Sequence, residues 1–256
     1  MHDDHDVYEH MAVLLDGAQL TNTGDQLTYP GLFPPSISSV IITLAPGETF
    51  KKHLHVVPVY AYVLQGEVTM TYVQDHEENV VQTYRQGEAF LEAAHTWHYG
   101  MNKGKEPMRI LALFLGAKGL PNFIDQPVMG KRQEQARHNI HGDMKVLLED
   151  VDATNTGQPL AYPSKPPAAI TSMLITLLPG EEIQPHMHVA PVFVYVLEGQ
   201  VTLDYEDTHT HTYKQGEAFI EAVNTWHHGI NSGNVPLRVL AVFIGAKGLP
   251  NTILPP

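Results

Sequence analysis

The segment GETFKKHLHVVPVYAYVLQG, residues 47–66, returns as GEEIQPHMHVAPVFVYVLEG at residues 180–199. Each copy begins and ends with glycine, carries a His-x-His pair, and continues into a run of apolar residues. A shared segment of this length at a constant offset of 133 indicates an internal repeat. The fold therefore has to be explained as one unit that occurs twice.

The repeat extends in both directions from this segment. Residues 21–24 return at the same offset, whereas residues 87–90, 96–98 and 116–122 return at an offset of 129. The change falls between Gly66 and Gly87, where a polar stretch is typical of a surface hairpin loop of variable length. We predict an N-terminal barrel with a His/Asp-rich tail at residues 1–128, a linker of short helix or coil at 129–139, and a C-terminal barrel at 140–256.

Short apolar runs predict that each unit is built from β-strands. Residues 40–44 and 173–178 are rich in branched side chains, and each run is stopped by Pro-Gly. Further strands are expected at 56–64, 68–73, 80–84, 89–92 and 109–115, with glycines between them. Many short strands at regular spacing are typical of an all-β sandwich or barrel, so only the linker and the stretch at 8–15 could be helical.

Composition excludes several classes of protein. The 256 residues include no cysteine, which rules out disulfide scaffolds, cysteine-ligated metal sites and thiol enzymes. The net charge of −13 provides no basic footprint, so nucleic acid is not an expected partner. No apolar run reaches the roughly 18 residues of a membrane span, and no secretory signal is visible. We therefore expect a cytoplasmic protein, or a periplasmic one if a leader has been removed.

Histidine is the unusual residue type, with 16 copies. Six of them occupy equivalent positions in the two units: His53, His55, His98, His186, His188 and His227. Residues i and i+2 of a strand point to the same face, so each His-x-His pair directs two imidazoles to one point. A third histidine from another strand completes a metal site that keeps open positions for substrate.

The motifs around these histidines resemble those of the cupin superfamily. Gly47, His53-x-His55 and Gly66 are similar to the first cupin motif, and Gly87 followed by His98-x-x-x-Asn102 is similar to the second. The second unit matches with Gly180, His186, His188, Gly199, Gly216, His227 and Asn231. The chain therefore resembles a bicupin, which implies two tandem jelly-roll (double-stranded β-helix) barrels with a short linker.

The resemblance implies that the three matched histidines of each barrel bind a divalent metal, usually together with a glutamate from the first motif. Val59 and Val192 occupy that glutamate position here. One interpretation is a three-histidine site, as in cupins similar to thiol or diketone dioxygenases. The other is a substitute carboxylate from Glu92 and Glu221. If Glu92 pairs opposite His98 across the intervening turn, its carboxylate enters the pocket, as a metal ligand or as a general acid/base; otherwise it faces solvent.

Three neutral histidines leave the metal its full charge, which favours a small organic anion as substrate. We expect a metal-dependent enzyme, with a dioxygenase-like oxidoreductase as the first choice. Alternatives are an isomerase, lyase or decarboxylase in which Glu92 and Glu221 move protons, and a non-catalytic metal- or ligand-binding sensor. Fe(II) is the favoured metal, one per barrel, with Mn, Zn, Ni or Cu as alternatives. The chain is expected to be a monomer with pseudo-dimeric barrels or a homo-oligomer.

Overall fold

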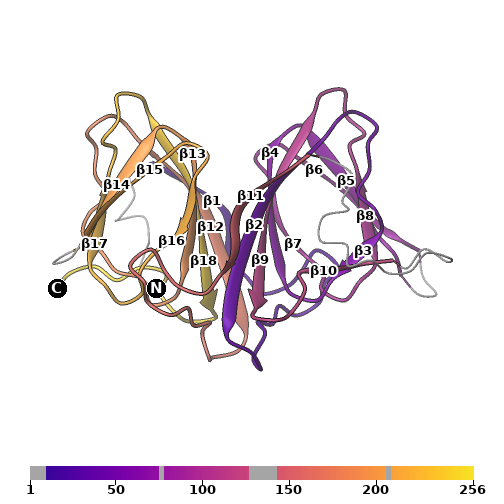
Figure 1. The fold of residues 1–256 in the computed structure, drawn as a ribbon, viewed down its shortest axis with the longest axis horizontal. Coiled ribbons are helices and arrows are strands. Elements are labelled where there is room, and N and C mark those ends of the chain that lie inside the picture. The colour runs from indigo at the N-terminus through magenta and orange to yellow at the C-terminus, as the bar shows by residue number, and fades with distance from the viewer. Residues whose placement is uncertain (1–9, 75–77, 127–142, 206–208) are drawn as a thin grey trace. The chain divides into compact units, whose positions relative to one another are not determined.

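The computed structural model describes residues 10–74, 78–126, 143–205 and 209–256, and every element in these ranges is a β-strand (Figure 1). The chain divides into two compact units. We call Leu20–Val151 the first barrel, and Met1–Gln19 together with Asp152–Pro256 the second barrel. The described residues contain no helix that could span a membrane.

The first barrel consists of two five-stranded sheets, ordered β11-β2-β9-β4-β7 and β10-β3-β8-β5-β6. Its strands are β2 (Pro35–Leu44), β3 (His53–His55), β4 (Val59–Gln65), β5 (Glu67–Tyr72), β6 (Val80–Arg85), β7 (Ala89–Glu92), β8 (His98–Met101), β9 (Met108–Ala117), β10 (Phe123–Asp125) and β11 (Asp143–Val151). Their pairings are antiparallel. A cluster of buried apolar side chains fills the interior, as in a jelly roll.

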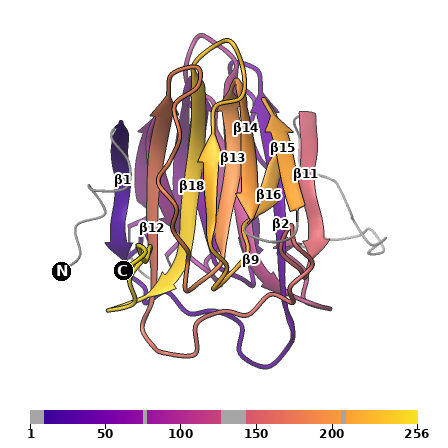
Figure 2. The same ribbon diagram turned by 90° about the vertical axis from the view of Figure 1, so that its left-hand side faces the viewer.

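The second barrel repeats this plan (Figure 2). Its sheets are ordered β1-β12-β18-β13-β16 and β15-β14-β17. The strands are β1 (Met11–Ala18), β12 (Ala168–Leu177), β13 (Val192–Glu198), β14 (Gln200–Tyr205), β15 (His209–Lys214), β16 (Ala218–Ile220), β17 (His227–Ile230) and β18 (Leu237–Ala246). The counterpart of β3 is reduced to isolated bridges, His186 with His227 and Met187 with Ile253.

The compact units differ from the sequence repeats by an exchange of strands. Strand β1 belongs to the first repeat but pairs with β12 in the second barrel, with Met11 opposite Ile175. Strand β11 belongs to the second repeat but pairs with β2 in the first barrel, with Asp143 opposite Thr43. The boundaries expected from the repeat, 1–128 and 140–256, therefore do not coincide with the compact units. The expected linker at 129–139 lies outside the described residues.

The strand at the start of the chain and the turn at Gly66 each have a physical explanation. The stretch at 8–15 was a candidate helix, and from Met11 onward it is strand β1 because the open edge of β12 supplies its backbone partners. The motif glycine at position 66 has a φ of 71°, and a Cβ there would lie 2.9 Å from the carbonyl oxygen of Pro107. Only glycine fits this turn.

The inner face of β4 and β13 shows the alternation of a strand that faces a core on one side. Val59, Ala61 and Val63 lie in the interior cluster of the first barrel, and the equivalent positions 192, 194 and 196 lie in that of the second. The buried Asn102 holds the neighbouring turn: its Nδ2 donates to the carbonyl oxygens of Leu44 and Glu106 at 3.0 and 2.9 Å.

Candidate metal centre

In each barrel the three motif histidines converge on one point. The ligand atoms of His53, His55 and His98 lie within 4.8 Å of one another, and so do those of the second-barrel set, His186, His188 and His227. All six side chains are buried. The first two come from β3, whose alternation points them to the same side, and His98 stands directly opposite His53 on β8. The structure therefore brings together the three predicted histidines of each barrel.

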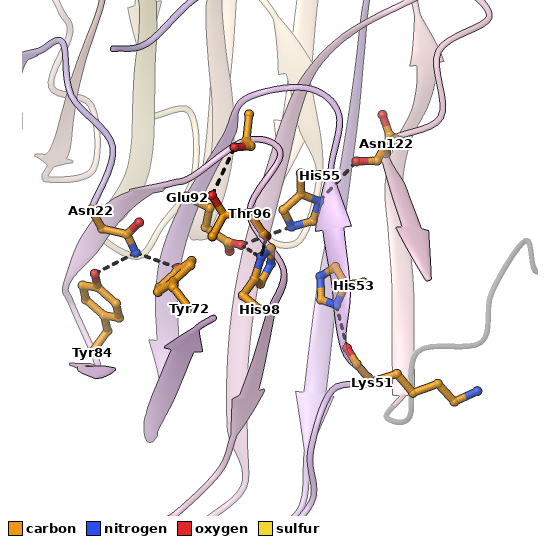
Figure 3. A network of polar contacts seen from close by, with 11 residues as sticks. Asn22, Lys51, His53, His55, Tyr72, Tyr84, Glu92, Thr96, His98 and Asn122 are labelled. Atoms are coloured by element: carbon orange, nitrogen blue, oxygen red, sulfur yellow. Dashed lines mark hydrogen bonds and ion pairs between the residues drawn. The ribbon is translucent and has the colours of Figure 1, made fainter. Parts of the chain in front are cut away.

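The histidine rings are held in one tautomer by main-chain carbonyls. The Nδ1 atoms of His53, His55 and His98 lie 2.7, 3.1 and 2.8 Å from the carbonyl oxygens of Lys51, Asn122 and Thr96 (Figure 3). The second barrel repeats these bonds with Gln184, Asn251 and Thr225. Since a carbonyl oxygen can only accept, Nδ1 carries the proton and the Nε2 lone pair of the neutral ring points into the barrel, as metal binding requires.

A buried glutamate completes the cluster in each barrel. Glu92 is only 6% exposed, and its Oε2 lies 3.1 Å from Nε2 of His55 and 3.2 Å from Nε2 of His98. In the second barrel, Glu221 lies 3.2 Å from Nε2 of His188 and 3.8 Å from Nε2 of His227. Both carboxylates therefore face the pocket and not solvent.

The glutamate enters the pocket by a route that the sequence did not predict. The expectation that Glu92 pairs opposite His98 is wrong, because β8 pairs with β3 and β5 while Glu92 stands opposite Val59 in the β4–β7 pair. The second barrel is the same, since the amide of Glu221 donates to the carbonyl of Val192 at 2.9 Å. The histidines thus come from one sheet and the carboxylate from the other. The valine at the usual glutamate position lies beside a carboxylate on the adjacent strand.

The donor set fits a divalent metal. Two ligands bonded to one metal at about 2.1 Å, at angles between about 90° and 110°, are separated by about 3.0–3.4 Å. The carboxylate-to-Nε2 distances of 3.1 and 3.2 Å around Glu92 match this separation. A carboxylate oxygen and a bare Nε2 are both acceptors, so they approach this closely only with a proton or a metal ion between them. The Nε2 atoms of His98 and His227 are buried without a hydrogen bond in the described chain, which is the same signal.

The electrostatics keep the ligand groups in their metal-binding forms. Burial, helped by the neighbouring imidazoles, lowers the pKa of His53 and of His186 to about 3, so both rings are neutral near pH 7. Burial alone raises the pKa of Glu92, but the contacts with His55 and His98 outweigh it and hold that pKa well below its ordinary value. The same balance lowers the pKa of Glu221 to about 2. Near pH 7, His53 and His186 are therefore neutral nitrogen donors, and Glu92 and Glu221 are ionised.

The space beside each cluster is small and apolar. A cavity of about 30 Å³ adjoins His53, His55 and Glu92, and one of equal size adjoins His186 and Glu221. Apolar side chains form the remaining walls, in the first barrel Ile42, Phe50, Met70, Ile110, Ala112, Phe114 and Phe123. This volume accommodates roughly two water molecules, since about 10–15 Å³ is needed for one. The inner cavity alone therefore holds only a very small ligand.

Sequence reasoning missed a polar network behind the histidines. The Tyr72 ring packs 5.2 Å from that of His98, and its hydroxyl accepts a bond of 2.6 Å from Nδ2 of Asn22, which also reaches Tyr84 (Figure 3). The second barrel repeats the arrangement, with Tyr205 5.1 Å from His227 and bonded to Asn155. These asparagine and tyrosine residues are identical at equivalent positions of the two repeats, and this identity could have marked them in the sequence. Their role became visible only when the strands were paired.

Comparison with known proteins agrees with this architecture. Residues 40–114 and 173–243, more than half of the chain, match the Cupin domain family. The chain belongs to the cupin family. A curated relative of this cupin protein, germin-like protein subfamily 2 member 2 of Arabidopsis thaliana, is 31% identical over 86 residues, which cover 33% of this chain and 39% of the relative. The match therefore spans well under half of that relative's length.

Solved structures share the fold of this chain. A mutant of Bacillus subtilis oxalate decarboxylase matches with a TM-score of 0.61 at 17% identity, over 86% of this chain and 71% of that one. A structure from work on the Mn(II) centres of the same enzyme matches with a TM-score of 0.58 at 17% identity, again over 86% and 71%. At this identity the likeness concerns the fold.

Proposed function

We propose that this bicupin is a metal-dependent lyase of the decarboxylase type, with one divalent metal per barrel and a small organic carboxylate as substrate. The observation that carries the proposal is the buried cluster of three Nε2 atoms and one carboxylate, present in both barrels. The similarity to oxalate decarboxylase favours this reaction over the dioxygenase that the sequence analysis placed first. The Mn(II) centres of that enzyme make Mn(II) as strong a candidate as Fe(II).

The chemistry assigned to the site is redox-neutral. In decarboxylation the bond between the carboxylate carbon and its neighbour breaks, the electron pair stays on the neighbour, and a proton replaces the released CO₂. A divalent metal bound by the three histidines and the glutamate would supply the positive charge that holds a carboxylate and stabilises developing negative charge. The reaction consumes no oxidant, which separates it from dioxygenase chemistry.

The residues of the chain have distinct tasks in this proposal. The carbonyls of Lys51, Asn122 and Thr96 keep the imidazoles in the ligating orientation. The apolar walls of the inner cavity exclude bulk water and strengthen electrostatic interactions within it. In Glu92 both histidine contacts use Oε2, and we assign to Oε1 the relay of a proton from water to the carbon that loses CO₂. Glu221 is the equivalent residue in the second barrel, where Oε2 lies 3.2 Å from His188 and Oε1 lies 3.8 Å from His227.

The test measures metal content, CO₂ release and oxygen uptake on one sample. We expect two metals per chain after loading with Mn(II), and release of CO₂ from oxalate or a 2-oxo acid without stoichiometric uptake of oxygen. His55→Ala and His188→Ala should each remove one metal, and the double variant should lose both the metal and the activity.

The alternatives give different results in the same assay. Oxygen uptake that matches product formation in the Fe(II)-loaded protein would replace the lyase with a dioxygenase. Binding of carboxylates without any turnover would identify a non-catalytic sensor. A chain that retains less than one metal after loading would contradict a metal-dependent function altogether.

A further inference from the structure

A second, larger cavity opens onto Glu92 in the first barrel. Its volume is about 600 Å³, within the range of small-molecule sites. It is lined by the segment that leads into β2, by the connection between β3 and β4, and by the turn that leads into β8. Glu92 lines both this cavity and the inner cavity of the metal centre, so the two spaces adjoin at this side chain. A ligand too large for the inner cavity has room here.

The wall of this outer cavity is partly apolar, and no lysine or arginine is among the described residues that line it. Its apolar lining includes Leu27, Pro30, Leu32, Phe33, Val56, Pro58, Ala94 and Leu120, and its uncharged polar lining is Thr21, Gln26, Thr28, Tyr29 and Thr96. Asp25 and Glu92 are the charged residues among the described lining, and both are acidic. Leu32 is 93% exposed and Phe33 47% exposed, so both present apolar surface to an incoming ligand. His95 is the one lining side chain that could become a cation.

We propose that the first barrel binds a monoanion whose carboxylate head enters the metal centre and whose uncharged, apolar body lies against this wall. The inference rests on the proposed function and specifies its substrate class. A second carboxylate on the ligand would lose its hydration beside Asp25 without a fixed positive partner. An apolar body gains burial instead, about 0.8 kcal/mol for each CH₂ removed from water. The wall therefore selects against ligands with a second carboxylate on the part that lies in the outer cavity.

The second barrel differs at the equivalent positions of the wall. Lys165, Pro166 and Asn224 stand where the first barrel has Leu32, Phe33 and His95. The turn that leads into the third histidine is nevertheless alike, since His95 and Asn224 share a left-handed φ of 59° and 54°. The two barrels thus present different walls around equivalent metal centres, and the second barrel provides matched control positions.

Two 2-oxo acids with the same head and different tails test the proposal. The first is 4-methyl-2-oxopentanoate, with an uncharged branched tail, and the second is 2-oxoglutarate, with a carboxylate tail. Both are titrated calorimetrically into the full chain carrying His186→Ala and His188→Ala, loaded with redox-inert Zn(II), so that only the first barrel binds. We expect 4-methyl-2-oxopentanoate to bind at least tenfold more tightly than 2-oxoglutarate.

Substitutions in the wall should change this preference. Val56→Lys places a cation in the outer cavity and should bring the ratio of the two affinities to one or below. Leu32→Lys, at a surface position that tolerates the change, should shift the ratio in the same direction by a smaller factor. Val189→Lys, the equivalent of Val56→Lys in the second barrel, should leave the ratio unchanged.

The outcomes distinguish this inference from the proposed function. Binding of 2-oxoglutarate as tightly as 4-methyl-2-oxopentanoate overturns the assignment of substrate class and leaves a metal-dependent carboxylate enzyme intact. Binding of neither acid to protein that elemental analysis shows to be loaded overturns both. A ratio that stays the same in Val56→Lys and Leu32→Lys also overturns the inference, because the ligand body then lies elsewhere.

Discussion

The substitution Glu92→Gln isolates the contribution of the carboxylate to the first metal centre. It keeps the size of the side chain and one ligating oxygen, but it removes the negative charge beside His55 and His98. Because Glu221 supplies the second centre from its own barrel, that centre serves as an internal reference. We expect one weakened and one unchanged metal site per chain.

The size of the effect follows from charge and burial. Two unit charges about 4 Å apart attract by about 4 kcal/mol at an effective dielectric constant of about 20, and a divalent ion roughly doubles this value. The cost of burying the carboxylate cancels several kcal/mol of that gain. A net loss of about 3 kcal/mol remains, which corresponds to about a 100-fold weaker metal affinity.

Competition with a chelating dye measures both metal affinities in one titration. Glu92→Gln and Glu221→Gln should each produce one tight and one weak site, and the double variant should produce two weak sites. Placing Val59→Glu on a Glu92→Val background should restore part of the affinity, because the two residues stand opposite each other. Two unchanged tight sites in Glu92→Gln would show that the carboxylate does not contact the metal.

Three further predictions concern the fold and the cluster. A fragment of residues 1–128 lacks β11, the strand that pairs with β2, and should form a strand-exchanged dimer. A fragment of residues 20–151 contains the whole compact unit and should be a monomer. Light scattering measures both masses, and the reverse result would contradict the strand exchange. In the metal-free protein, His53 and His186 have a pKa of about 3 when folded and their ordinary value of 6.5 when unfolded, so the unfolded chain binds more protons as the pH falls below 6.5. Acidification from neutral pH to pH 5.5 should therefore lower the free energy of unfolding by about 3 kcal/mol for the pair, as measured by denaturant titration. A free energy of unfolding that does not change over this pH range would contradict the prediction. Tyr72→Phe keeps the ring on His98 but removes the hydroxyl that accepts from Asn22. It should lower the free energy of unfolding by about 1 kcal/mol without changing metal stoichiometry, and loss of the metal would assign the hydroxyl a larger role.

The sequence was informative wherever the signal was local or repeated. Runs of branched residues predicted the strands that became β2, β9 and β12, because alternation and apolar content express burial directly. The repeated histidines predicted two clusters, since residues i and i+2 share a strand face whatever the rest of the fold does. Short elements such as β8 and β10 were not predicted, because three or four residues carry too little pattern.

The repeat alone thus indicates two β-barrel copies with three inward-facing histidines each. How the copies are closed and how each site is completed follow from strand pairings that only the folded chain reveals. Strand β1 pairs with the sheet of the other repeat, and Glu92 reaches the histidines from opposite Val59 in the second sheet of its barrel. Both facts depend on which strands become neighbours. Strand neighbours are chosen by packing and backbone hydrogen bonding across long sequence separations, which no local pattern records.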